Sequence, residues 1–147
     1  VKEDVAYATC KEEVENIPAD FRNRDIPVAV INEHLQGDLV KFYGVHGTDF
    51  FYWFYPSPCS HSKFGLEKIN GIAKGIPFSV EELKIQSDKA AEALNVPIYG
   101  GDCVVSADGT LRIIDFNDWP SFARCREEAG GKIAECIYNR AKKQMKQ

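Results

Sequence analysis

The sequence predicts a single α+β domain over residues 1–147, in which an antiparallel sheet packs against helices. Three observations favour this fold class. Two apolar runs meet at Asp108-Gly109, a dipeptide typical of the tight turn of a β-hairpin. Ser79 and Glu82 form a capping box, which predicts the start of a helix. A chain of 147 residues with 44% hydrophobic residues is long enough to bury a core of its own.

In chain order, the first expected elements are a short strand and a helix. Residues 5–8 are a strand candidate. Residues 10–24 predict a helix, with Thr9 as its N-cap and acidic residues in its first turn. Pro18 lies inside this helix, and a proline there removes a backbone hydrogen bond and clashes with the preceding turn. We therefore expect the helix to be kinked or broken.

Three strands are expected next. The apolar run at residues 27–35 ends in polar residues and predicts a buried strand. Gly37-Asp38 then turns the chain into a strand at residues 39–45. Six consecutive aromatic residues at 50–55 favour a strand covered on both faces. Thr48-Asp49 would join these last two strands in a hairpin.

Residues 56–78 are expected to form a loop, and loops of this length are often functional. Cys59 and His61 alone give a poor zinc signal, because a second pair of ligands is lacking. Two interpretations remain for the positive and titratable side chains in this loop. In the first, these side chains contact phosphate or an anionic substrate, and in the second they are ordinary solvated charges. The residues concerned are His61, Lys63 and Lys68.

Two longer helices complete the prediction. The first runs from the N-cap Ser79 to about Leu94, and its inward-facing residues are Leu83, Ser87, Ala90, Ala91 and Leu94. The second covers residues 122–143, with Ser121 as its N-cap. Its buried stripe and the end of that stripe are expected at Phe122, Cys125, Ala129, Ile133, Cys136, Ile137 and Arg140.

The hairpin at residues 98–122 brings acidic side chains together. With a two-residue or symmetric four-residue loop, Asp102 opposes Asp115 and Gly100 opposes Asn117, whereas a three-residue loop would put the aspartates on opposite faces. Opposed like charges are destabilising unless a cation lies between them. Carboxylate and amide oxygens are ligands that magnesium prefers. The pattern allows two interpretations, a magnesium site or an acidic hairpin exposed to water.

The segments GGDCVV (100–105) and RIIDFNDWPSF (112–122) resemble the C-terminal metal-binding hairpin of the ATP-grasp superfamily. That superfamily includes D-alanine–D-alanine ligase, glutathione synthetase, biotin carboxylase and inositol phosphate kinases. The resemblance implies an ATP-grasp C-terminal subdomain in which Mg²⁺ or Mn²⁺ binds Asp102, Asp115 and Asn117. Two departures are an aspartate at 115, where many members have glutamate, and Gly100, where the ligases often carry a substrate-facing arginine.

A second segment, VINEHLQGDLVKFYG (30–44), resembles the hinge of the same superfamily, where backbone groups read the adenine edge. By this resemblance Asp38 binds the ribose and Lys41 approaches the phosphates. A slip of one residue would turn Asp38 to the other face of the sheet. A solvated glutamate, a surface histidine and a strand lysine are the alternative interpretation. The residues expected at the adenine are Asn32, Glu33, His34 and Leu35.

The resemblance implies the ATP- and magnesium-binding part of a ligase that activates a carboxylate through an acyl phosphate, for attack by an amine or thiol. A kinase of a small hydroxylated substrate, or a non-catalytic nucleotide-binding module, are the alternatives. No catalytic base is predicted, because phosphoryl transfer depends on positioning and cations. The chain has no glycine-rich phosphate loop, so the resemblance implies a fragment whose partners are N-terminal ATP-grasp subdomains and a small-molecule substrate.

The formal net charge of −4, without a basic stripe, argues against nucleic acid or an anionic membrane as the main partner. The five cysteines are widely spaced and include no C-x-x-C pair, which favours reduced thiols in a cytoplasmic protein. No signal peptide is recognised, and no apolar run approaches the length of a membrane span.

Overall fold

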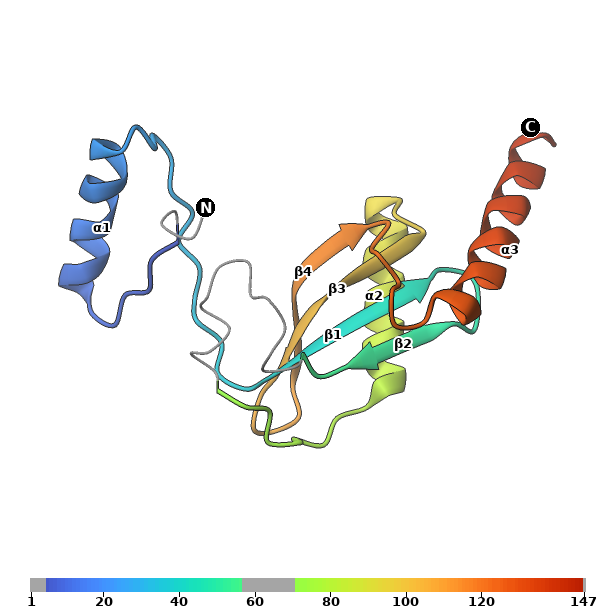
Figure 1. The fold of residues 1–147 in the computed structure, drawn as a ribbon, viewed down its shortest axis with the longest axis horizontal. Helices are drawn as coiled ribbons and strands as arrows, with labels where there is room; N and C mark the ends of the chain where they lie inside the picture. Colours follow the sequence, from blue (N-terminus) through green and yellow to red (C-terminus); the bar gives the residue numbers. More distant parts are fainter. Residues whose placement is uncertain (1–4, 57–70, 147) are drawn as a thin grey trace.

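A computed structural model of the chain describes residues 5–56 and 71–146 (Figure 1). The described residues form an α+β fold, as predicted, with a four-stranded antiparallel sheet of order β2-β1-β3-β4. The predicted loop residues Cys59, His61, Lys63 and Lys68 lie outside these ranges. The elements are α1 Lys11–Asn23, β1 Asp38–Val45, β2 Phe51–Phe54, α2 Val80–Leu94, β3 Ile98–Val105, β4 Leu111–Asp118 and α3 Arg126–Gln144.

Helix α2 covers one face of the sheet (Figure 1). It begins as predicted, with the Ser79 hydroxyl accepting a hydrogen bond from the Glu82 N–H, and it ends at Asn95 in the left-handed conformation. Alternate residues of β1 are buried, because successive side chains of a strand point to opposite faces. The core between α2 and the sheet contains Val40, Phe42, Leu83, Ala91, Tyr99, Cys103, Val105 and Leu111.

Tyr99 fastens α2 to the sheet. Its hydroxyl donates a hydrogen bond to the Asp88 carboxylate at 2.8 Å, and the Lys84 ammonium contacts the other carboxylate oxygen. Burial, and then the charge of Asp88, raise the pKa of Tyr99 far above its usual value, so the hydroxyl remains a donor. Gly44 makes room for this ring, because a Cβ there would lie 2.3 Å from the Tyr99 ring.

The aromatic run forms β2, an edge strand. The strand covers Phe51–Phe54, and its four side chains are half-buried on both faces instead of fully covered. Thr48 donates its N–H to the Val45 carbonyl, which confirms the predicted turn between β1 and β2.

The first part of α3 packs on the second face of the sheet. The helix begins at Arg126 and not at 122, because Phe122 has φ +49° and the preceding segment folds as turns. Its N-cap is Cys125 without a side-chain cap, so the prediction of Ser121 was wrong. The core on this face contains Val45, Phe50, Ile98, Phe122, Cys125, Ala129 and Cys136.

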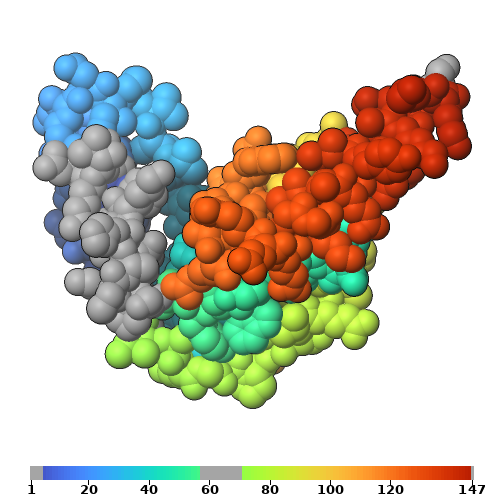
Figure 2. Space-filling view, turned by 45° about the vertical axis from the view of Figure 1, so that its right-hand side comes forward, coloured from blue at the N-terminus to red at the C-terminus, as the bar shows by residue number. Residues whose placement is uncertain are grey.

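Beyond Cys136, α3 projects away from the sheet (Figures 1 and 2). Ile137 and Arg140 are exposed there, so the buried stripe ends at Cys136, before the last residues expected to trace it. Leu94, at the end of α2, is also exposed, although it was expected to face inward.

Helix α1 stands apart from the sheet, on the opposite side from α3 (Figure 1). It is one helix with Pro18 inside, and its N-cap is Cys10, whereas Thr9 donates to the Glu13 carboxylate. The strands predicted at residues 5–8 and 27–35 are absent from the described structure. The apolar run at 27–35 was misinterpreted, because it forms no strand pairing within the described residues and three of its apolar side chains are exposed: Val28, Val30 and Ile31.

We predict that Gly44→Ala lowers the free energy of unfolding by about 1–3 kcal/mol, because the added methyl group would push the Tyr99 ring out of its place. Gly130→Ala is the matched control, since it lies on exposed α3 with nothing within 4 Å of an added Cβ. The control should gain about 0.5–1 kcal/mol from helix propensity. Urea unfolding measures both. Equal stabilities for the two variants would contradict this account of Gly44.

Ser87 faces the core as predicted, and its buried hydroxyl has no hydrogen-bond partner among the residues that the structure describes. A buried hydroxyl without a partner opposes folding, because it has lost its bonds to water. We therefore expect Ser87→Ala to keep the stability unchanged or raise it by about 1 kcal/mol. Leu83→Ala, one helical turn away, should instead cost about 2–5 kcal/mol. Thermal unfolding of the two variants compares them, and a destabilised Ser87→Ala variant would show that the hydroxyl is bonded.

Candidate functional site

Three charged residues form a row across the face of the sheet opposite α2. Lys41 of β1 pairs with Asp102 of β3, which pairs with Asp115 of β4. Directly paired residues of an antiparallel sheet point to the same face, with Cβ atoms about 4.5–5.5 Å apart. The structure therefore brings Asp102 and Asp115 together, as the sequence predicted, and adds Lys41 beside them.

The aspartates oppose each other for a reason that the sequence did not reveal. The hairpin loop has three residues, 107–109, because Ser106 pairs with Thr110 and Gly109 takes a left-handed φ of +82°. This register would place Asp102 opposite Ile114. A β-bulge between Asp102 and Cys103 shifts the ladder by one residue and restores the opposition. The predicted loop length was wrong, and the predicted pairing is confirmed.

Lys41 and Asp102 form an ion pair that water reaches only in part. The Lys41 ammonium lies 2.9 Å from both carboxylate oxygens of Asp102. The two side chains are 28% and 22% exposed, respectively, so this pair is less screened than one at the surface. The sequence predicted that Lys41 points toward phosphates, and in this structure its charge is directed at a predicted metal ligand.

Asp115 and Asn117 are exposed on the same face of β4. The Asn117 side-chain amide donates a hydrogen bond to the Asp115 carboxylate. A half-turn of this amide would present its carbonyl oxygen instead. The donors are then hard oxygens open to water, a set that fits Mg²⁺ completed by waters and phosphates. Among the described residues, no group of three or more His, Cys, Asp or Glu side chains could hold a metal ion.

Two further side chains border the row. Pro120 lies over Gly100, where a Cβ would come within 2.8 Å of the proline ring. Arg124 lies over the ring of Phe54, 4.3 Å from its centroid, and Phe54 pairs with Lys41 on the same face. No sequence signal could have found this second cation, because the turns before α3 have no period.

Asp38 lies on the opposite face from the row. It is three residues before Lys41 on β1, and its side chain is buried, 3% exposed. Its two oxygens accept hydrogen bonds from the backbone N–H groups of Lys74 and Ile76, each at 2.8 Å. Burial alone would raise the pKa of Asp38, but the backbone N–H donors outweigh it and lower that pKa. The Asp38 carboxylate thus holds the backbone of residues 74–76 against β1.

The residues expected at the adenine do not join the row either. Asn32, Glu33 and His34 are exposed and Leu35 is half-buried, in a segment without regular structure. His34 packs edge-on against Tyr7 with ring centroids 5.0 Å apart. A pocket of about 360 Å³ is lined by Tyr7, His34, Gln36, Gly37, Asp38, Lys74, Ile76 and Ala107. Of the predicted site residues, His34 and Asp38 therefore line this pocket. Lys41 lies on the other face of the sheet, in the row with Asp102 and Asp115.

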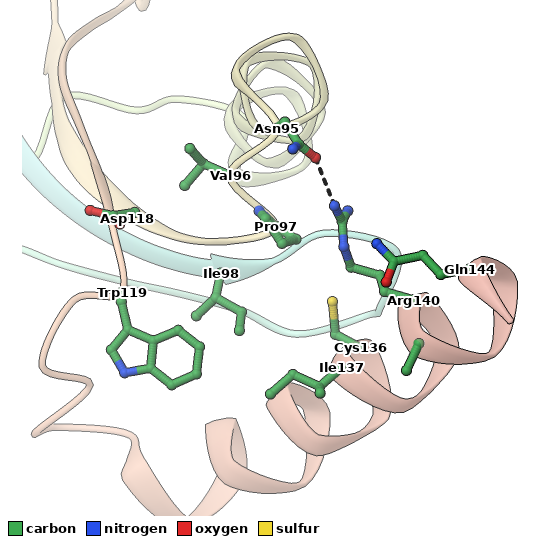
Figure 3. Close-up of a pocket in the computed structure, with 11 residues that line it drawn as sticks. Asn95, Val96, Pro97, Ile98, Asp118, Trp119, Cys136, Ile137, Arg140 and Gln144 are labelled. Carbon is green, nitrogen blue, oxygen red and sulfur yellow. Dashed lines mark hydrogen bonds between the residues drawn. The ribbon is translucent and has the colours of Figure 1, made fainter.

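A second pocket of about 440 Å³ lies between the end of α2, the ends of β3 and β4, and α3 (Figure 3). Arg140 reaches across it and donates a hydrogen bond to the Asn95 side chain at 2.7 Å. Trp119 and Ile137 border it on the solvent side and are exposed. None of the predicted site residues lines this pocket.

Comparison of the chain with protein-family models, with curated proteins and with solved structures found no match. Within residues 5–56 and 71–146, none of the helices combines the length and apolar character needed to cross a membrane.

We predict that Asp38→Asn lowers the free energy of unfolding by about 1–3 kcal/mol at neutral pH, because charge-assisted bonds to two N–H groups are weakened. The folded pKa of Asp38 is depressed, so its contribution is present above the unfolded pKa of about 3.9 and is lost as the pH falls through the lower folded value. Urea unfolding between pH 7 and 2 measures this contribution. The difference in the free energy of unfolding between wild type and variant should shrink as the pH falls. A constant difference would contradict a stabilising role of the ionised Asp38 carboxylate.

Proposed function

We propose that this chain is the ATP- and magnesium-binding part of an ATP-grasp-type enzyme. The favoured activity is that of a ligase, which activates a carboxylate through an acyl phosphate for attack by an amine or thiol. The observation that supports the proposal is the opposed pair Asp102 and Asp115, with Asn117 beside it, on the face of the sheet opposite α2, where Asp115 and Asn117 are exposed. Two adjacent carboxylates are unfavourable unless positive charge lies beside them. Lys41 supplies one such charge at Asp102, and a metal ion at Asp115 and Asn117 would supply more.

The chain's own groups would hold the phosphate end of the nucleotide. Asp102, Asp115 and Asn117 would carry Mg²⁺ or Mn²⁺, which neutralises charge on the transferring phosphate when bound. Lys41 and Arg124 border the same face and supply cations for phosphate oxygens. No general base is needed, because phosphoryl transfer relies on positioning and electrostatics.

Support for the base end of the nucleotide is weaker. Asp38 lies on the other face and already accepts two backbone hydrogen bonds, which does not favour a ribose-binding role. His34 shares a pocket with Asp38, away from the row. The proposal therefore concerns the phosphates, and it includes a separate phosphate-loop subdomain and a small-molecule substrate as partners.

We predict that Asp115→Asn weakens Mg²⁺-dependent ATP binding at least about tenfold, because a metal ligand is lost. The fold should persist, since Asp115 is exposed and its side chain bonds to Asn117 on the same strand. Calorimetric titration of ATP, with and without Mg²⁺, measures the affinity, and circular dichroism checks folding. In an enzyme completed by its partner subdomains, Asp115→Ala should abolish activity.

Asp118→Asn is the matched control for this variant. It removes the same charge from the same strand, three residues away and on the opposite face. ATP binding by this variant should equal that of wild type. Unchanged binding by Asp115→Asn, or equal losses in both variants, would refute the proposed site.

A further inference from the structure

The Lys41 ammonium places a positive charge beside Asp102, on the side of β1. It contacts both oxygens of Asp102 at 2.9 Å, so both are engaged before any ion arrives. Asp115 lies on the other side of Asp102, on the next strand. The row therefore contains two negative charges and one positive charge, and the positive charge is that of the Lys41 side chain.

This arrangement offsets the repulsion that the strand pairing imposes. Opposed like charges destabilise a sheet, and a neighbouring opposite charge relieves that cost. A divalent cation at Asp102 would take over this task. Because the lysine and the metal would contact the same carboxylate, their positive charges would repel each other at close range, so each would weaken the binding of the other to Asp102.

We propose that Lys41 is a tethered counter-ion that competes with the divalent cation for Asp102 and turns to the nucleotide phosphate when the cation binds. This inference rests on the proposed function of the site. It goes beyond it by making binding of the metal and of the phosphate mutually dependent. The metal displaces the lysine, and the phosphate then provides the lysine with a new anionic partner.

The chemistry of the side chain suits this exchange. Lysine is a compact charge on a flexible four-carbon stem, so its head can swing while its backbone remains in the sheet. The pair is partly exposed to water, at 28% for Lys41 and 22% for Asp102. Arg124 could not replace it at Asp102, because its guanidinium is stacked on Phe54 at the far side of Lys41.

The test measures Mn²⁺ binding by the full chain without nucleotide, using the electron spin resonance signal of free Mn²⁺. Lys41→Met removes the ammonium and keeps much of the apolar stem. We expect this variant to bind Mn²⁺ about three- to tenfold more tightly than wild type, because the competing ion pair is gone. It should also gain more thermal stability from saturating Mn²⁺ than wild type does.

Lys84→Met is the matched control. Lys84 also pairs with an aspartate, Asp88, and their exposed fractions of 26% and 23% resemble those of the Lys41 pair. It lies on α2, which covers the other face of the sheet. Its Mn²⁺ affinity should equal that of wild type. A gain shared by both variants would show a general charge effect and would overturn the proposal.

A second arm tests release of the lysine toward phosphate. With saturating Mn²⁺, Lys41→Met should bind ADP more weakly than wild type, and Lys84→Met should bind it equally. If Lys41→Met is unstable without metal, Lys41→Gln serves as the second neutral variant. Unchanged ADP affinity in the neutral variants would overturn the release step.

The outcomes separate the two proposals. If wild type binds Mn²⁺ and loses it in Asp115→Asn, but Lys41→Met and Lys41→Gln bind no more tightly, the metal site stands and the competition is overturned. If neither the wild type nor any of the variants binds Mn²⁺, the proposed function and this inference are both overturned.

Discussion

Two like charges held opposite each other on neighbouring strands are the constraint on which the proposed site depends. Asp102 and Asp115 gain nothing from their own proximity, and the backbone ladder of β3 and β4 keeps them together. Lys41 relieves part of the repulsion from the other side. The strand pairing itself thus creates the need for positive charge beside Asp102 and Asp115.

The face covered by α2 makes this possible. Phe42 and Tyr99 are fully buried beneath α2, so the strands cannot turn over or slip without exposing them. Tyr99 also bonds to Asp88 of α2, which fixes the helix on the sheet. The alternation of strand residues then presents polar groups on the opposite face, where α3 covers only part of the surface. Packing on one side therefore positions the chemistry on the other.

The parts of the fold with strong local signals were predictable. The capping box located α2, and the Asp-Gly hairpin located β3 and β4. The failures came where tertiary pairing decides. Residues 27–35 have the composition of a buried strand, but they form no strand in the part of the chain that the structure describes. The ribose-binding role of Asp38 stays a prediction, and its place in the alternation of β1 puts it on the face that α2 covers. Neither outcome can be read from local composition.

The pairing of the aspartates shows how a correct contact can follow from an incorrect turn. Gly101 supplies the physical link, because a Cβ there would lie 2.2 Å from the Asp115 carbonyl oxygen and 2.7 Å from the Phe42 ring. Glycine therefore allows β4 to approach β3 closely beside the bulge, while Phe42 fills the space below. The register at Asp115 is set by this close approach in the middle of the strands. The three-residue loop at 107–109 would by itself place Asp102 opposite Ile114. The bulge beside Asp102, in which Ile114 is the extra residue of β4, shifts the pairing by one residue to Asp115.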